Sequence, residues 1–569
     1  MADSPGRSVM MRRQHVLLVD TIVLGVVGAL AAQIFVWLLH LSQDLFLTHL
    51  AGYVPPDLPS GGGTLRQIIG AHWLWLVPVA TTLGGLISGV LVYSIAPEAE
   101  GHGTDTAVRS FHRDSGFIRP RVTPLKIVAS AITIGSGGSA GREGPTALFS
   151  AGVGSIYASL THRSDAEKRL LVLIGMAAGL SAIFRSPIGT AIFAVEVLYG
   201  EMQFEAGALI YTMIGSIIAY AVNGLFVGWQ PLFQVPAGLT AGSMAGYGWF
   251  IVLGLGSGVV GALLPTVFYG VRDAFKAIPI PPHVKPAIGG LGVGLLALAL
   301  PQVLGGGYGW IQEAIDGNLA LTILGLLVFA KMLAFALTVS SGGSGGVFAP
   351  SLFVGAMVGS FLAQLVGQPP AAFAVIGMAA VFGSAARIPI ATLLMVTEMT
   401  GGYSLLAPAA LAVMLAFLVQ RQLTANAKYG SLYEAQVPRP ADSPAHRMEH
   451  LRTAIKMLGE RRLFDAETLG HLNLFSLLES GIPVDLPDGK QLLIETLPPN
   501  SPWVGKPVKE GGFMRDDVDW EVVALLRDEH LILPHPNTVM EADDEVLILV
   551  PPECREELKA RVRAGEPVS

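Results

Sequence analysis

Residues 137–145, GGSAGREGP, recur at residues 342–350 as GGSGGVFAP, and both stretches read G-G-S-x-G-x-x-x-P. Glycine runs that lead into a proline cannot continue a regular helix. Each stretch therefore predicts a place where one helix ends and another begins.

A second pair of similar stretches follows the first pair. FRSPIGTAIFAVEV begins at Phe184 and ARIPIATLLMVTEM begins at Ala386, and both contain R-x-P-I-x-T with a glutamate eleven residues after the arginine. The two members of the first pair lie 205 residues apart, and the two members of the second pair lie 202 residues apart. Two motifs in the same order at a nearly constant offset indicate an internal duplication, and duplicated membrane halves commonly enclose a site at their interface.

Composition supports a membrane setting for these breaks. Of the 569 residues, 51% are hydrophobic and 14% are charged, and the mean hydropathy is +0.56. About a dozen apolar segments between Val16 and Gln420 are long enough to span or partly span a bilayer. We expect a multi-pass protein of the cell inner membrane or plasma membrane.

The orientation follows from the charges at the amino terminus. Arg7, Arg12 and Arg13 precede the first apolar segment, and no cleavage-site pattern follows it. Positive charge is retained on the cytoplasmic side of a membrane, so both the N- and the C-terminus are expected in the cytoplasm.

The sequence becomes polar after Arg421. KQLLIETL, WEVVALLRDEHLILP and DEVLILVPP read as strands, and ECREELKARVRAG reads as a closing helix. HRMEHLRTAIKMLGERR reads as an amphipathic connector helix. The predicted fold is an all-α polytopic membrane domain over residues 1–437, a linker over 438–487 and a small cytoplasmic α+β domain over 488–569.

The glycine-rich breaks suit anion binding. A helix start offers unpaired N–H groups and the positive end of the helix dipole, which together attract an anion without holding it as tightly as a full positive charge. Glu143, inside the first break, is costly in a membrane and is therefore a functional candidate. The alternatives are that the glycines only allow close helix packing and that Glu143 only pairs with Arg142.

The same residues carry a family resemblance. GREGP, GGVFAP, GHGTD at 101–105 and the tyrosine of GSLYEAQ make the chain similar, over roughly residues 16–437, to the CLC family of chloride channels and proton-coupled anion exchangers. The resemblance implies inverted repeats, a homodimer with one pore per subunit, and transport of chloride or another small monovalent anion. It implies a gating and proton-carrying role for Glu143 and anion binding at His102, Gly141, Arg142, Val347, Phe348 and Tyr433.

Glu143 can act through its charge alone. As a carboxylate it is itself an anion and can occupy an amide-lined anion position. When protonated it loses that attraction and can swing away, which opens the path.

Two positions depart from the family pattern. Val197 stands where the exchangers usually have a second glutamate, with Glu196 one position before it and Glu201 nearby. This favours a passive voltage- or pH-gated chloride channel, with a chloride/proton antiporter as the alternative. His102 stands where the family usually has a serine, so the imidazole can donate an N–H, carry a positive charge, block the mouth or bond to a backbone carbonyl. Nitrate, bromide and fluoride therefore stay open as anions.

The tail has a resemblance of its own. Residues 488–562 are similar to the regulatory domain at the carboxy-terminal end of TrkA-type potassium-transport proteins. That resemblance implies dimerisation and possible binding of cyclic di-AMP, so the tail either controls the pore through a ligand or serves as a structural clamp. No G-x-G-x-x-G follows a strand, so NAD binding is not expected.

Other classes of function fit less well. The single cysteine, Cys554, allows no internal disulfide or zinc framework, and no basic stripe suggests nucleic acid. GGSAG and GGSGG match the G-x-S-x-G pattern of serine hydrolases, but a nucleophile has no reason to be duplicated. An intramembrane hydrolase is a distant alternative, and we expect neither an enzyme nor a cofactor. Glu398, the counterpart of Glu196, is expected to be a structural or interface carboxylate.

Overall fold

The computed structural model describes residues 5–70, 74–236, 238–240, 244–446, 484–485, 490–508, 521–527, 530–532, 534–535 and 537–563. The chain divides into two compact units, Met1–Pro438 and Arg439–Ser569. Apart from its first residue, the connector helix that the sequence predicts over 446–462 lies outside the described residues.

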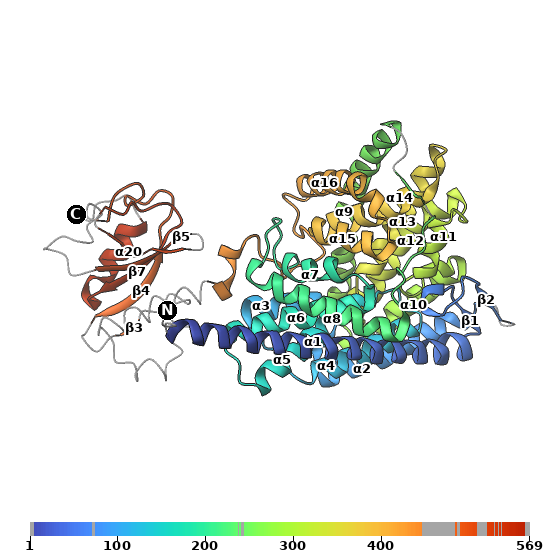
Figure 1. Ribbon diagram of the computed structural model, residues 1–569, viewed down its shortest axis with the longest axis horizontal. Coiled ribbons are helices and arrows are strands. Elements are labelled where there is room, and N and C mark those ends of the chain that lie inside the picture. The colour runs from blue at the N-terminus through green and yellow to red at the C-terminus, as the bar shows by residue number, and fades with distance from the viewer. Residues whose placement is uncertain are drawn as a thin grey trace. The chain divides into compact units, whose positions relative to one another are not determined.

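The described residues of the first unit are mostly helical (Figure 1). In chain order their α-helices divide into two sets of eight. The first set is α1 Pro5–Gln43, α2 Val77–Ile95, α3 Thr104–Arg113, α4 Val122–Gly135, α5 Glu143–Leu160, α6 Asp165–Phe184, α7 Pro187–Glu196 and α8 Leu209–Val227. The second set is α9 Met244–Ala277, α10 Lys285–Ala299, α11 Tyr308–Ile315, α12 Leu321–Ser340, α13 Phe348–Leu365, α14 Pro370–Ala385, α15 Pro389–Thr400 and α16 Leu406–Leu423.

Short elements connect these helices. They are a π-helical turn η1 Asp44–Leu50, a small hairpin of β1 Tyr53–Val54 and β2 Ile68–Ile69, and the 3-10 turns η2 Pro59–Gly61, η3 Pro97–Ala99, η4 Ala206–Ala208, η5 Pro282–Val284, η6 Pro301–Val303 and η7 Tyr403–Leu405. A further 3-10 turn, η8 Pro440–Asp442, belongs to the second unit. The N-terminus and α3 lie toward one end of α1, and the β1–β2 hairpin lies toward its other end (Figure 1).

Eight helices of the described chain are long and apolar enough to cross a membrane. They are Gln14–Leu50, Val77–Ile95, Ala206–Val227, Tyr247–Ala277, Pro282–Ala299, Leu321–Ser340, Phe348–Leu365 and Tyr403–Leu423. Four shorter apolar helices, α4, α7, α14 and α15, have 10–17 residues. The mostly helical, multi-pass fold that the sequence predicts is thereby confirmed, although several of the dozen apolar segments are too short to cross the membrane.

The short helices α7 and α15 begin in the same way. Arg185 and Arg387 adopt left-handed backbone conformations with φ of 55° and 57°, and a proline then opens the next helix, at Pro187 and Pro389. Proline is favoured at a helix start because its missing N–H would have no intrahelical partner there. The duplicated R-x-P motif therefore encodes a pair of sharp helix starts inside the membrane unit.

The pairing of helices is also duplicated. In the first set α5 packs on α6, and in the second set α13 packs on α14; α2 packs on α10 and α9 on α16. Glycines allow these close approaches: a side chain at Gly355 would collide with the backbone of Gly377. The core that results is one continuous cluster of buried apolar residues running through both sets.

The second unit contains a five-stranded antiparallel sheet in the order β3-β4-β7-β5-β6. Its elements are β3 Val484–Asp485, β4 Gln491–Thr496, β5 Glu521–Arg527, β6 His530–Ile532, β7 Glu545–Val550, η9 Pro552–Cys554 and α20 Arg555–Arg563. Leu558 and Val562 of α20 pack with the buried residues of β4, β5 and β7. The predicted small α+β domain is confirmed, and the stretch read as one strand, WEVVALLRDEHLILP, holds two.

Candidate functional site

A closed chamber lies in the middle of the first unit. It is too narrow to admit a water-sized sphere. The lining residues come from the starts of α3, α5 and α13, from α6 and α7, and from the segment after α16: Thr104, Glu143, Gly144, Leu180, Phe184, Phe193, Val347, Phe348 and Tyr433. Three helix N-termini therefore converge on one small space, and each offers unpaired N–H groups and a positive dipole end.

The two glycine-rich breaks meet at this chamber. Gly141 and Gly346 exchange backbone hydrogen bonds, with N···O distances of 2.8 Å from Gly141 N and 2.6 Å from Gly346 N. A Cβ on Gly346 would lie 2.7 Å from the backbone nitrogen of Gly144. The glycines are thus required by direct backbone-to-backbone packing between the two halves.

Glu143 is the first residue of α5 and its side chain is 2% exposed. Its Oε2 accepts a hydrogen bond from the backbone N–H of Ala349 in the first turn of α13, at 3.4 Å. Its Oε1 has no hydrogen-bond partner among the described residues. The carboxylate therefore lies against the N-terminus of a helix from the opposite half, in the kind of position that an anion would take.

Val347 and Phe348 form the start of α13 and are both buried. As the first residues of a helix, their N–H groups have no intrahelical acceptor. The ring of Phe348 packs against Phe184 at 4.5 Å and Phe382 at 4.3 Å between ring centroids. These rings place an apolar wall beside the amide groups.

Arg142 lies on the side of Glu143 that faces the β1–β2 hairpin region. Its guanidinium lies over the ring of Tyr308, 4.7 Å from the centroid, and both residues line a separate cavity of about 80 Å³. Within the described part of the chain, Arg142 forms no ion pair with Glu143 within 4.0 Å, the arrangement that the alternative structural interpretation required. The cation instead lies beside Glu143 at a second cavity.

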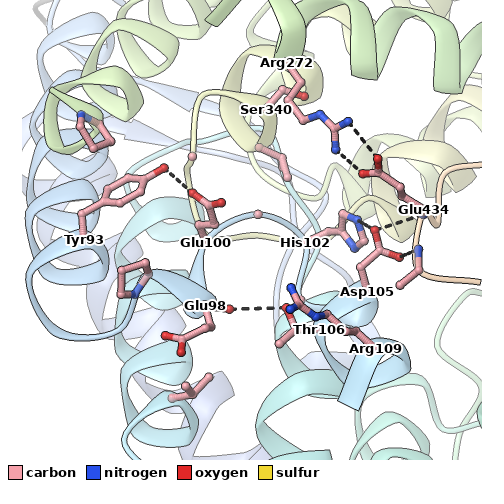
Figure 2. A pocket seen from close by; sticks show the side chains of 18 of the residues that line it. Tyr93, Glu98, Glu100, His102, Asp105, Thr106, Arg109, Arg272, Ser340 and Glu434 are labelled. Atoms are coloured by element: carbon pink, nitrogen blue, oxygen red, sulfur yellow. Dashed lines mark hydrogen bonds and ion pairs between the residues drawn. The ribbon is translucent and has the colours of Figure 1, made fainter. Parts of the chain in front are cut away.

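A large vestibule lies on the other side of the chamber. Its volume is about 1190 Å³, and its lining includes His102, Asp105, Arg109, Arg272 and Glu434 (Figure 2). These residues come from the start of α3, the end of α9 and the segment after α16. Figure 1 shows α3 toward the same end of α1 as the N-terminus.

His102 and Tyr433 separate the vestibule from the chamber. Their ring centroids are 5.5 Å apart, Tyr433 lines the chamber and His102 lines the vestibule. The His102 Nε2 lies 3.1 Å from Asp105 Oδ2 (Figure 2). The partner of this histidine is therefore a carboxylate, and not a backbone carbonyl as one interpretation of the sequence proposed.

Asp105 also holds the segment that carries Tyr433. Its carboxylate accepts hydrogen bonds from the backbone N–H groups of Glu434, at 3.2 Å, and Ala435, at 3.1 Å. Glu434 in turn pairs with Arg272 of α9 at 2.6 Å (Figure 2). Asp105, which sequence reasoning missed, thus fixes His102 and Tyr433 relative to each other, and its place in GHGTD was the available signal.

Two buried lysines support the loops beside the chamber. Lys126 Nζ donates to the carbonyls of Ala99 and Gly101, at 2.9 and 2.7 Å. Lys331 Nζ donates to the carbonyls of Val303 and Gly305, at 2.8 and 2.7 Å. Neither lysine has an ion pair in the described residues. The two lysines lie 205 residues apart, which is also the separation of the two glycine motifs. Applying this separation to Lys126 in the sequence would have identified Lys331.

The residues selected from the sequence thus divide into three places. Glu143, Val347, Phe348 and Tyr433 line the chamber, Gly141 lies behind Glu143, Arg142 lies at the cavity on one side and His102 at the vestibule on the other. The rest of the chamber wall was not selected; it consists of Thr104, Gly144, Leu180, Phe184 and Phe193. Val197 is fully buried and apolar.

Comparison with known proteins gives two matching family models. Residues 84–421 match the family described as voltage gated chloride channel, and residues 492–563 match the TrkA-C domain. The resemblances of both parts of the chain are thereby confirmed.

Individual relatives cover most of the first unit. The H(+)/Cl(-) exchange transporter ClcA of Vibrio parahaemolyticus is 32% identical over 392 residues, covering 65% of this chain and 82% of that protein. The voltage-gated ClC-type chloride channel ClcB of Escherichia coli K12 is 29% identical over 426 residues, covering 73% of this chain and 98% of that protein. The crystal structure of a slow cyanobacterial Cl⁻/H⁺ antiporter has a TM-score of 0.63 at 22% identity, covering 73% and 96% of the two chains, and shows the shared fold.

Proposed function

Since the chain belongs to the voltage-gated chloride channel (CLC) family, whose members carry anions across membranes, we propose that it exchanges chloride for protons. Chloride moves through the chamber in one direction, and protons move in the other. The observation that carries this proposal is the position of the Glu143 carboxylate at the amide-lined start of α13.

Glu143 links the anion path to a proton. The carboxylate competes with an anion for the N-terminus of α13, because both are negative and both are attracted by the same unpaired N–H groups. Protonation removes that attraction. Each displacement of Glu143 from the chamber therefore takes up a proton, and each return releases one.

The chamber is consistent with exchange. It leaves no room for a water-sized sphere between the vestibule and the cavity at Arg142. An exchanger requires that the two sides not be open together, and a channel with its gate closed would present the same chamber. The relative named as an H(+)/Cl(-) exchange transporter supports the same proposal.

A passive chloride channel is the second candidate. Val197, which the sequence analysis singled out, cannot carry a proton, and it is completely buried. The relative ClcB is named a voltage-gated chloride channel. This is the function that the sequence pattern favoured, and it differs from exchange in one measurable quantity, the movement of protons.

We assign the anion-binding groups by position. The N–H groups of Val347 and Phe348 and the Tyr433 hydroxyl group face the chamber, His102 borders it on the vestibule side, and Gly141 and Arg142 flank Glu143. We propose that the vestibule faces the cytoplasm, as the arginines before α1 predict. The homodimer, the cell inner membrane or plasma membrane, and cyclic di-AMP on the tail domain stay predictions.

The test is simultaneous recording of chloride efflux and external pH from liposomes that contain the full chain. Exchange predicts that protons move uphill when a chloride gradient drives them, and that Glu143→Gln abolishes proton movement while chloride still flows. Glu313→Gln, at an exposed carboxylate of α11 that bonds Asn318, is the matched control and leaves both fluxes unchanged. Chloride flux without proton flux in the wild type would establish the channel instead.

A further inference from the structure

His102 stands at the boundary of two cavities and carries a nitrogen that nothing in the described structure satisfies. The side chain is 7% exposed, and its Nδ1 is buried without a hydrogen-bond partner among the described residues. A buried polar atom without a partner is costly, so its persistence needs an explanation.

Asp105 places a carboxylate beside one nitrogen of the imidazole. The His102 Nε2 lies 3.1 Å from Asp105 Oδ2, an ion pair when the imidazole is protonated. Asp105 is itself held by the N–H groups of Glu434 and Ala435, which keeps the carboxylate in place. Nδ1 is the nitrogen that has no partner among the described residues.

We propose that His102 is the proton acceptor at the vestibule end of the chamber, with Asp105 as its positioning residue. The imidazole takes a proton from the vestibule, beside Asp105, and the Asp105 carboxylate stabilises the imidazolium that forms. The proton is passed on toward Glu143 at the other end of the chamber, and His102 returns to the neutral form. This inference rests on the proposed exchange function and supplies the proton site that Val197 cannot provide.

Several charged groups lie around His102 on the vestibule side. Asp105 is the negative group in contact with the ring. Arg272 and Glu434 pair with each other, which leaves them nearly neutral together. The Lys126 ammonium donates to two backbone carbonyls. The Glu100 carboxylate accepts a hydrogen bond from the Tyr93 hydroxyl. Arg109 is exposed on the vestibule wall. Tyr433 and Glu143 face the chamber.

The groups between the two titratable side chains are suited to passing a proton. Thr104 and Tyr433 line the chamber between the vestibule end and Glu143, and both carry hydroxyl groups that can donate and accept. Protonated His102 also becomes an N–H donor with a positive charge, so an anion in the chamber is held more strongly while the proton is bound. Proton and anion occupancy at this end are thereby linked.

The experiment compares His102→Gln with the wild type in the liposome assay. Glutamine keeps a hydrogen-bonding side chain of similar reach but cannot be protonated, so chloride flux is retained while proton flux falls by about a hundredfold, as expected when a proton-transfer group is lost. His162→Gln, at an exposed histidine in the turn after α5, is the control and leaves both fluxes unchanged. If His102→Gln does not fold, His102→Ser replaces it.

Two further arms make the result decisive. Chloride binding to the purified wild type, measured by calorimetry at about pH 5 and about pH 8, should be tighter at the lower pH, and this difference should be smaller in His102→Gln. Asp105→Asn should move the proton-coupled flux toward lower pH, because the imidazolium loses its counter-charge. A His102→Gln variant with wild-type proton coupling would overturn the inference and leave exchange standing. A wild type that moves no protons would overturn both.

Discussion

Glu196 and Glu398 occupy equivalent positions in the two halves, and each caps the helix start of the opposite half. Glu196 accepts from the N–H groups of Ile390, at 3.2 Å, and Ala391, at 2.6 Å. Glu398 accepts from Ile188, at 3.2 Å, and Gly189, at 2.8 Å, and from the Ser186 hydroxyl at 2.6 Å. The two carboxylates thus satisfy the orphan donors of α15 and α7, which gives both a structural role.

Removing either cap should destabilise the protein without uncoupling transport. In each wild-type carboxylate both oxygens accept hydrogen bonds, whereas a glutamine side chain has a single acceptor oxygen. We therefore expect Glu196→Gln and Glu398→Gln each to lower the free energy of unfolding by about 1 kcal/mol. Thermal unfolding in detergent measures this loss. Proton-to-chloride stoichiometry should stay at the wild-type value in both variants, and a loss of coupling in Glu196→Gln alone would instead make Glu196 a proton carrier.

Transport should increase as the pH falls on the side of Glu143. The ionised carboxylate holds the start of α13, and protonation releases it, so the fraction of open gates grows with proton concentration. Chloride flux in Glu143→Gln, which is permanently neutral, should be nearly independent of pH. Flux recorded in liposomes over a series of external pH values checks this, and an equal slope in both proteins would contradict the assigned gate.

A methyl group at Gly141 should force the gate out of its place. A Cβ there would collide with Glu143 Oε2, so Gly141→Ala displaces the carboxylate from α13. We expect chloride flux with weakened pH dependence and weakened proton coupling. Gly256→Ala in α9 is the matched control, because a Cβ at Gly256 meets no atom within 4 Å. Wild-type pH dependence in Gly141→Ala would show that the gate tolerates the displacement.

The two buried lysines should matter for stability to a similar degree. Lys126→Met and Lys331→Met each remove two hydrogen bonds from an ammonium to loop carbonyls. We expect each substitution to lower the free energy of unfolding by on the order of 2 kcal/mol. Denaturant or thermal unfolding of the full chain measures this, and an unchanged midpoint in either variant would show that water replaces the ammonium.

The tail domain depends on a separate ion pair. Arg527 of β5 binds Asp544 through two hydrogen bonds of 2.8 Å, and Asp544 is buried. Arg527→Met leaves that carboxylate without its cation, which should cost about 3 kcal/mol. Hydrogen exchange of β5 and β7 in the full chain should speed up, while exchange in the first unit stays unchanged. Equal protection of β5 and β7 in both proteins would mean that Asp544 finds another partner.

The sequence alone predicts the structural features that occur once in each half of the duplicated chain. The glycine breaks and the R-x-P helix starts lie at fixed offsets, so their places in the two halves could be identified before any contact was known. The contact between Asp105 and the N–H groups of Glu434 and Ala435 joins residues 329 and 330 positions apart, and no periodicity encodes it.

Other features were missed for local reasons. The turn between β5 and β6 holds no glycine or proline, so WEVVALLRDEHLILP reads as one strand although it forms a hairpin. Thr104 and Phe193 carry no unusual residue type, and only the convergence of α3 and α7 on the chamber gives them a role. Sequence patterns thus identify the residues that break helices better than the residues that merely line a space.

The bond between Gly141 and Gly346 has a consequence for the symmetry of the chain. Equivalent residues of the two halves touch each other there, so the axis that relates the halves passes through this contact. Such a contact is self-complementary, as at the two-fold axis of a dimer. Two residues further on, the equivalent positions carry Glu143 in one half and Phe348 in the other, so the side chains do not keep the symmetry that the backbone contact shows.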